Sequence, residues 1–198
     1  MTMQSSPDAC QAFTRTQRAR RDDIVAAAIA VLDGEGYAAA SLERIAKEAA
    51  TSKSTVLYHF KSKEAINQAV VRLLSENGAA SMAERIMAVD SSRDRLRAYL
   101  SSNLHFIAEN AAHVNAVHRI LENVGFHVYT TDAVSPLRQL LASGQQTGEF
   151  GSFDPEVMAL AIRAIVDVAS FYFTAHPDLD LDHYIDQVVQ LFDKATAP

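Results

Sequence analysis

The chain has 198 residues, of which 48% are hydrophobic and 21% charged, and it carries a formal net charge of −6. This is the composition of a globular protein long enough for one large or two small domains. No uninterrupted run of eighteen apolar residues occurs, and the N-terminus has no apolar core. These absences predict a cytoplasmic protein without a membrane span or export signal. The single cysteine, Cys10, can form neither an internal disulfide nor a zinc site by itself.

Charge is unevenly distributed along the chain. Residues 1–64 hold nine lysines and arginines against eight acidic residues, whereas the remaining residues hold nine against sixteen. The N-terminal cations gather around 15–21 and 53–63. A local basic surface on an acidic protein is compatible with DNA binding, because phosphates are neutralised locally. A solvated charged face explains the same asymmetry equally well.

Apolar residues recur at helical spacing along almost the whole chain, with few glycines and prolines, which predicts an all-α fold. The first helix ends at Gly34 and Gly36, and Gly36 suits the left-handed position that follows many helices. The apolar stripe of this helix consists of Ile24, Ala28, Val31 and Leu32.

Two short helices follow, over 42–49 and from Ser52 to about His59, with a tight turn around 50–51. Ser41 and Ser52 are expected as their N-caps. This pattern is typical of a helix-turn-helix, whose second helix enters the major groove. The residues expected to hold that helix to its domain are Val56, Leu57 and Phe60. The residues left facing outward, with donors for phosphates and base edges, are Ser52, Lys53, Ser54, Thr55, Tyr58 and His59.

Beyond residue 64 the chain is more apolar. Ser62 is expected to cap a helix from 63 to about 89 with a weak point at 77–78 and with Ile66, Val70, Leu73 and Leu74 facing inward. Further helices are expected over about 92–110, 112–125, 134–147 and 155–175, followed by a last one that carries a stripe near the C-terminus. The helix over 155–175 is apolar on nearly every side, so it must be covered on both sides.

Residues 20–66, from RRDDIVAAAIAV to YHFKSKEAI, resemble the TetR family of bacterial transcriptional regulators. The features that carry the resemblance are the pair Gly36–Tyr37, the segment SLERIAKEA, the polar start of the second short helix, and YHFKSKE. The resemblance implies a flexible arm over 1–19, a helix-turn-helix DNA-binding domain over 20–64, and an effector-binding and dimerisation domain over 65–198. It also implies a homodimeric repressor, needing no cofactor, that a small hydrophobic ligand releases from a palindromic double-stranded DNA operator.

Carried over position by position, the resemblance implies DNA contacts from ten residues. They are Ser41, Arg44, Thr51, Ser52, Lys53, Ser54, Thr55, Tyr58, His59 and Lys63. Two positions depart from the family pattern. Ala50 stands where the turn often has glycine, and a positive φ there would cost on the order of 1 kcal/mol. Leu57 stands where tyrosine is common, so one phosphate contact is expected to be lost. The arginines of 15–21 either reach the minor groove or belong to a solvated arm.

The resemblance also implies an effector pocket and a dimer interface in the larger domain. The candidate effector-binding residues are His105, Phe126, His127, Arg163, Asp167, Phe171 and Tyr172. Aromatic residues at helical spacing are, however, more often plain core. Asp167 either binds a cationic or hydroxylated ligand or pairs with Arg163, four residues earlier. The last two helices are expected to form a four-helix interface between subunits, using Leu160, Ala164, Val168, Ile185, Val188, Val189 and Phe192.

The histidines and carboxylates also allow a metal site or another function to be considered. His105, Glu109 and His113 recur at four-residue intervals on one expected helix, as do His118 and Glu122. Histidines eight residues apart lie about 12 Å apart along a helix, too far to share one ion, so structural roles are favoured over a metal site. The alternatives to a regulator are a helical ligand-binding or interaction protein, or an enzyme using the C-terminal cavity. No catalytic motif stands out.

Overall fold

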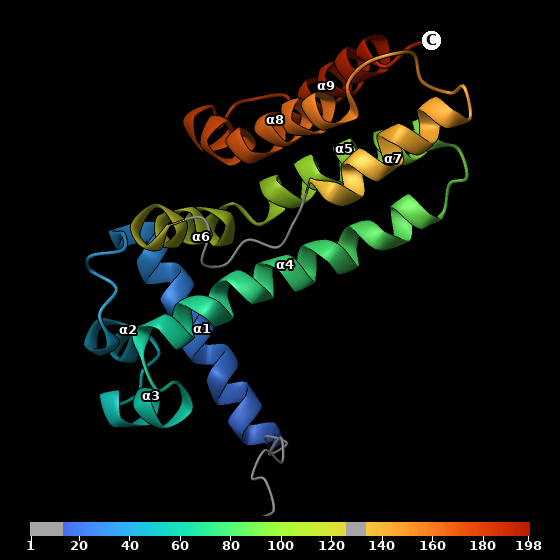
Figure 1. Cartoon of the computed structure of the whole chain (residues 1–198). Helices are drawn as coiled ribbons and strands as arrows, with labels where there is room; N and C mark the ends of the chain where they lie inside the picture. Colours follow the sequence, from blue (N-terminus) through green and yellow to red (C-terminus); the bar gives the residue numbers. More distant parts are fainter. Residues whose placement is uncertain (1–13, 126–133) are drawn as a thin grey trace, which may run out of the picture.

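The computed structural model describes residues 14–125 and 134–198, and these residues form helices and no strand. The helices are α1 (Arg15–Glu35), α2 (Leu42–Glu48), α3 (Lys53–His59), α4 (Lys63–Met87), α5 (Ser92–Glu109), α6 (Ala111–Val124), α7 (Ser135–Gln146), α8 (Pro155–Ala175) and α9 (Leu181–Ala195). Figure 1 shows α1, α2 and α3 gathered at one end and α8 and α9 at the other, with the long α4 extending from the first group toward the second. The all-α expectation is confirmed.

Serine side chains cap α2 and α3, the two helices of the helix-turn-helix, and also α4, which follows them. Ser41 Oγ accepts a hydrogen bond from the Arg44 amide at 3.2 Å, and Ser52 Oγ accepts one from the Thr55 amide at 3.1 Å. Ser62 caps α4 in the same way. Each cap satisfies an amide that the first turn of a helix leaves without a partner, so local sequence sets where these helices start.

The first helix begins earlier than the sequence suggested. Thr14 and Gln17 form a capping box, in which the Thr14 amide donates to Gln17 Oε1 at 2.9 Å and the Gln17 amide donates back to Thr14 Oγ1. Residues from Arg15 onward are therefore helical, and the expected arm over 1–19 is wrong for 15–19. The arginines between 15 and 21 belong to α1, while residues 1–13 lie outside the described chain.

Ala50, which stands where the family pattern often has glycine, lies in the turn between α2 and α3. Ala50 has a φ of +47°. No other non-glycine residue of the described chain has a positive φ. The Thr51 amide donates to the Ala46 carbonyl at 2.9 Å, which closes the turn around this backbone. Alanine therefore holds a conformation that glycine adopts without steric cost.

The first hydrophobic core holds the helix-turn-helix together. Val56 on α3 and Phe60, the residue directly after it, are buried, but Leu57 is 36% exposed, so its expected inward position is wrong. A helix of two turns presents one narrow inner face, and two residues four apart already occupy it. Leu73 on α4 is likewise exposed, while Leu74 is partly buried.

Helix α6 shares this first core, although it lies far along the chain. Ala116, Val117 and Ile120 pack with the helix-turn-helix residues. His113 Nε2 lies 2.8 Å from the Val70 carbonyl on α4, and Asn115 Nδ2 donates to Asp33 Oδ1 on α1 at 3.1 Å. The hydrophobic core therefore continues past the expected boundary at residue 64, through α4 and α6.

Helix α4 runs without a break through the expected weak point at 77–78. Gly78 is buried, and a Cβ atom at this position would lie 3.2 Å from the Phe106 ring on α5. The glycine thus allows close approach of α4 and α5 rather than a kink.

Helix α8 is buried on one side and bare on the other. Ala159, Ile162, Val166 and Ala169 belong to the second hydrophobic core, with residues of α5, α7 and α9. Leu160 and Val168 are each 52% exposed. By length and composition α8 is apolar enough to cross a membrane, although charged residues interrupt its apolar sequence. In this structure 28% of its most apolar stretch is buried. One such helix is weak evidence for a membrane span. Its bare apolar face needs a cover outside the described chain.

Replacing Ala50 with glycine is expected to raise the free energy of unfolding by about 0.5–1 kcal/mol. Relief of the positive φ outweighs the larger entropy of glycine in the unfolded chain. Urea denaturation measures the change. Ala49, whose φ is −75°, provides the matched control, and Ala49→Gly should not stabilise the protein. A loss of stability in Ala50→Gly would contradict strain at this turn.

Acidification is expected to weaken the fold through His113. Burial lowers the pKa of His113, against the smaller opposing effect of the Val70 carbonyl, so the native state holds the neutral ring. The unfolded chain takes up this proton below about pH 6.5, so the stabilisation is complete above that pH and is lost progressively as the pH falls toward the folded pKa. Melting temperatures of the wild type and of His113→Gln, measured between pH 7.5 and 5.5 (about one unit to either side of the ordinary value), should converge on acidification. Substitution of the exposed His183 by Gln is the control. Parallel curves for wild type and His113→Gln would refute the role.

Candidate nucleic-acid interface

The start of α3 presents a row of hydroxyl groups to solvent. Ser52 Oγ lies 2.7 Å from Ser54 Oγ and 2.8 Å from Thr55 Oγ1. Because hydroxyls both donate and accept, the same groups can turn to phosphate oxygens or base edges without leaving buried atoms unpaired. Tyr58, one helical turn later, is 66% exposed. The row therefore forms a polar surface on the side of α3 opposite Val56 and Phe60.

Lys53 is the cation at the start of this row, and it forms an ion pair with Glu43 of α2. Both residues are exposed. The hydrogen bond from Lys53 lowers the pKa of Glu43, followed by a smaller contribution from its own backbone amide. The Lys53 ammonium group, which is expected to contact DNA, is thus already paired with the Glu43 carboxylate.

Arg44 is held between two carboxylates. Its Nε donates to Glu35 Oε1 at 2.9 Å, and its Nη2 lies 2.9 Å from Glu48 Oε2. Hydrogen bonds to Glu35 and then to Glu48 raise the pKa of Arg44. Contact with a DNA backbone would require this side chain to exchange a carboxylate for a phosphate.

The end of α3 is anchored by α1. Arg21 donates a hydrogen bond to the His59 carbonyl, and its guanidinium lies 4.0 Å from the centroid of the Phe60 ring. Gln17 Nε2 donates to the Tyr58 hydroxyl at 3.3 Å. Sequence reasoning had assigned Arg21 only to a basic arm, and no local pattern identifies its contact 38 residues away.

His59 lies beneath Tyr58 in an edge-on ring contact, with centroids 5.1 Å apart. Its Nδ1 is buried and has no hydrogen-bond partner among the described residues. Burial, followed by repulsion from Arg21 and Arg20, lowers the pKa of His59, so the ring is neutral at pH 7. His59 can therefore offer DNA a neutral hydrogen bond, but no charge.

Lys63, the expected phosphate clamp, is partly buried at the start of α4. Its Nζ donates to the Tyr37 carbonyl at 2.7 Å and lies 3.8 Å from the centroid of the Tyr37 ring. Burial lowers its pKa. Lys63 thus joins α4 to the loop after α1. Lys61, which belongs to the basic cluster of the sequence but not to the expected DNA contacts, is an exposed cation beside it.

In the described chain, most of the predicted effector residues pair with neighbouring side chains. Arg163 Nη1 donates to the Tyr99 hydroxyl at 3.1 Å, and its Nη2 pairs with Asp167, which is the salt bridge that the four-residue spacing allowed. Phe171 makes an edge-on ring contact with His118, and Tyr172 stacks on His176 and Tyr184. His105 Nε2 lies 4.0 Å from Asp182 Oδ1. Phe126 and His127 fall outside the described residues.

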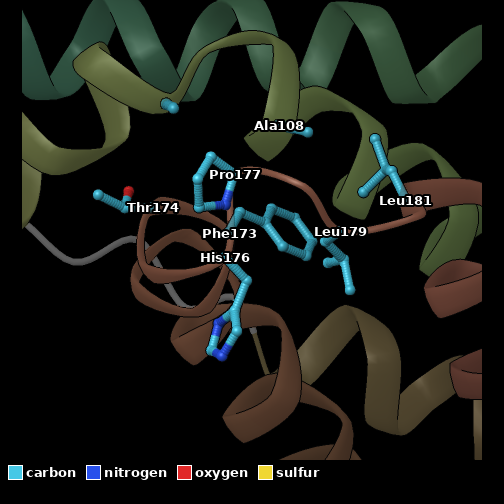
Figure 2. A pocket seen from close by; sticks show the side chains of 8 residues that line it. Ala108, Phe173, Thr174, His176, Pro177, Leu179 and Leu181 are labelled. Carbon is cyan, nitrogen blue, oxygen red and sulfur yellow. The ribbon is translucent and has the colours of Figure 1, made fainter.

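Figure 2 shows a pocket between the α5–α6 junction and the end of α8, with Phe173 and His176 on its wall. Its volume is about 220 Å³. Pockets for drug-sized ligands usually enclose roughly 300–1,000 Å³. None of the predicted effector residues within the described part of the chain lines this pocket. Its volume is also smaller than that expected of an effector site.

The predicted dimer residues divide into two groups. Leu160, Ala164 and Val168 on α8 are exposed and available to a second copy. On α9 the buried residues Ile185, Val188 and Phe192 belong to the second core, with Val189 packed against it, so assigning the first three to an intersubunit surface is wrong. The apolar stripe of α9 is satisfied within one chain. Leu191, on the opposite side, is 53% exposed.

The histidines whose spacing suggested a metal site do not all lie on one helix. His105 and Glu109 lie on α5, whereas His113 lies on α6, because the helix ends at Asn110. In the described part of the chain, no cluster of three or more histidine, cysteine or acidic side chains is arranged to hold a metal ion.

Comparison with known proteins identifies the N-terminal segment. Residues 24–70 match the family described as bacterial regulatory proteins, tetR family. The regulator BetI 1 of Chromohalobacter salexigens is 31% identical over 88 residues, which cover 44% of each chain. The transcriptional activator FasR of Mycolicibacterium smegmatis is 30% identical over 92 residues, or 46% of this chain and 42% of FasR. The matched segments thus span less than half the length of these curated relatives.

Solved structures match over nearly the whole chain. A tetR-family regulatory protein from Rhodococcus RHA1 has a TM-score of 0.78 at 22% identity, covering 90% of this chain and 97% of that protein. AibR, solved with isovaleryl coenzyme A and operator DNA, has a TM-score of 0.74 at 20% identity, covering 87% and 97%. Identities this low show a shared fold.

Proposed function

The chain belongs to the tetR family of bacterial regulatory proteins, a family of transcriptional regulators and not enzymes, and from this premise we propose that it acts as a homodimeric repressor. In this proposal α3 reads a palindromic operator, and a small-molecule effector bound in the larger domain releases the DNA. The observation that carries the proposal is the polar surface of α3, held outward by Val56 and Phe60 on its inner side.

The residues at the start of α3 are the proposed readers of sequence. Lys53, Ser54 and Thr55 supply donors and acceptors for base edges, as recognition helices do with their N-terminal residues. Ser41, Arg44, Thr51, Ser52, Tyr58, His59 and Lys63 are proposed as further contacts, chiefly to phosphates, which fix the register of the protein on the duplex. Lys61 joins this set because it is exposed beside α3.

A second copy is the proposed cover for the bare face of α8. Leu160, Ala164, Val168 and Phe171 are exposed on that helix, and Leu191 is exposed on the adjacent α9. A symmetric pair of α8 and α9 helices would bury this surface as a four-helix interface. It would also place two α3 helices on one duplex, which requires a separation of roughly 34–36 Å. A cytoplasmic dimer of this kind accounts for the apolar composition of α8 without a membrane.

The proposed effector acts through the helices that span both parts of the molecule. AibR, a structural neighbour, binds a coenzyme A thioester and operator DNA, which supports an effector-responsive regulator. Arg163, Asp167, Phe171, Tyr172 and His105 remain candidates for contacts, although Arg163 and Asp167 already pair with each other. Release requires the effector to bind the state with separated α3 helices more tightly, because equal affinity for both states shifts nothing.

Selection from random duplex DNA should enrich a palindrome if the proposal holds. Lys53→Ala is expected to weaken binding to the enriched sequence by about tenfold or more, since a lost base contact costs about 1–3 kcal/mol. Circular dichroism and light scattering should show the variant folded and dimeric, and an operator–reporter fusion should be derepressed. Enrichment of no sequence would favour a ligand-binding protein whose helix-turn-helix lacks an operator. Increased rather than decreased reporter output in the presence of the protein would indicate an activator.

Leu160→Glu combined with Val168→Glu should convert the dimer into monomers. Each change places a carboxylate in a surface that the proposed interface desolvates, while both side chains remain exposed in one chain. Light scattering coupled to size exclusion measures the mass. Glu156→Gln, at the exposed start of α8, is the control and should leave the dimer intact. A double variant that stays dimeric would place the interface elsewhere.

A further inference from the structure

The ion pair between Lys53 and Glu43 spans the turn of the helix-turn-helix. Glu43 lies in the first turn of α2, and Lys53 is the first residue of α3. Their side chains are 62% and 49% exposed, respectively. Water and dissolved ions reach an exposed pair of this kind freely, so another anion can displace the carboxylate.

Glu43 offers Lys53 the same chemistry that DNA would offer. A carboxylate and a phosphate are both anionic oxygen acceptors, and an ammonium group binds either as a point charge. Glu43 is exposed, and the hydrogen bond from Lys53 lowers its pKa, so it is ionised at neutral pH. The free protein therefore already supplies its recognition lysine with an anion.

Lys53 differs in this respect from Arg44. Arg44 is shared by Glu35 and Glu48, so loss of either carboxylate leaves it paired with the other. Within the described residues Lys53 has one ion pair, to Glu43. Removing a single carboxylate should thus free Lys53 completely.

We propose that Glu43 competes with DNA for Lys53 and thereby limits the affinity of the helix-turn-helix for DNA. This inference rests on the DNA binding proposed above. When α3 enters the major groove, Lys53 Nζ leaves the Glu43 oxygen for a phosphate or a base-edge acceptor, and Glu43 takes up a cation from solution. One anion replaces another, so Lys53 adds less to affinity than an unpaired lysine would. The uptake of a cation also offsets part of the counterion release that makes DNA binding depend on salt.

The experiment compares full-length wild type with Glu43→Gln, which keeps the size of the side chain and removes its charge. Fluorescence anisotropy with a labelled duplex of arbitrary sequence, titrated between about 50 and 200 mM salt, gives affinity and salt dependence. Glu43→Gln should bind roughly two- to fivefold more tightly at the lower salt, the range expected for one exposed ion pair. The slope of log K against log salt should become steeper by up to about 0.9, as for one added phosphate contact.

Two controls separate competition from a general change in charge. In a Lys53→Ala background, Glu43→Gln should no longer tighten DNA binding, because no ammonium group is left for Glu43 and DNA to compete for. Glu64→Gln removes a charge from the same part of the molecule, at the first turn of α4. Glu64 interacts with its own backbone and Ser62 and, more weakly, with Lys63, but not with Lys53. Its effect should be smaller than that of Glu43→Gln.

The inference is overturned if a folded, dimeric Glu43→Gln binds DNA with unchanged or reduced affinity, since the pair would then only brace the turn. An equal gain in the Lys53→Ala background would also overturn it. Operator selection tests the proposed function separately. If no sequence is enriched while Glu43→Gln still tightens binding through Lys53, the specific operator is rejected and the competition stands. No DNA binding by any variant would reject both.

Discussion

The burial of Val56 and Phe60 is the constraint on which the DNA-facing surface depends. A helix of seven residues is not stable alone in water, so α3 exists because these two side chains hold it to the first core. Ser52 fixes its start, and Arg21 fixes its end through the His59 carbonyl and the Phe60 ring. Every outward residue from 53 to 59 takes its direction from this attachment, which is why the surface can be rigid although the helix is short.

Helix α6 contacts both ends of the molecule. On one side, His113 and Asn115 bond to α4 and α1, and Ile120 lies in the first core. Another residue of the same helix, His118, contacts Phe171 on α8. A rearrangement of α8 relative to α6 would thus reach the first core, which supports α3, so this helix is a direct route by which the proposed effector would influence the proposed DNA binding.

Local chemistry explains which expectations were right. Ser41, Ser52 and Ser62 cap the helices that they are expected to cap. Each of those bonds joins residues three apart, so spacing along the chain specifies them. The inward direction of Leu57 and Leu73 was wrong because two positions of a helix can be equally apolar while only one meets a neighbouring helix. The capping box at Thr14 was missed because basic residues after it suggested a solvated arm.

The sequence by itself determined the helices, the starts of α2, α3 and α4, the helix-turn-helix and the turn position where a positive φ would strain Ala50. Each of these depends on residues within a few positions of one another. Only the tertiary structure decided that Lys53 meets Glu43, that Arg21 holds the end of α3, and that α9 buries its stripe inside its own chain. Those contacts join residues on different helices. Helical periodicity specifies a face but not its partner, and the partner depends on how the helices pack.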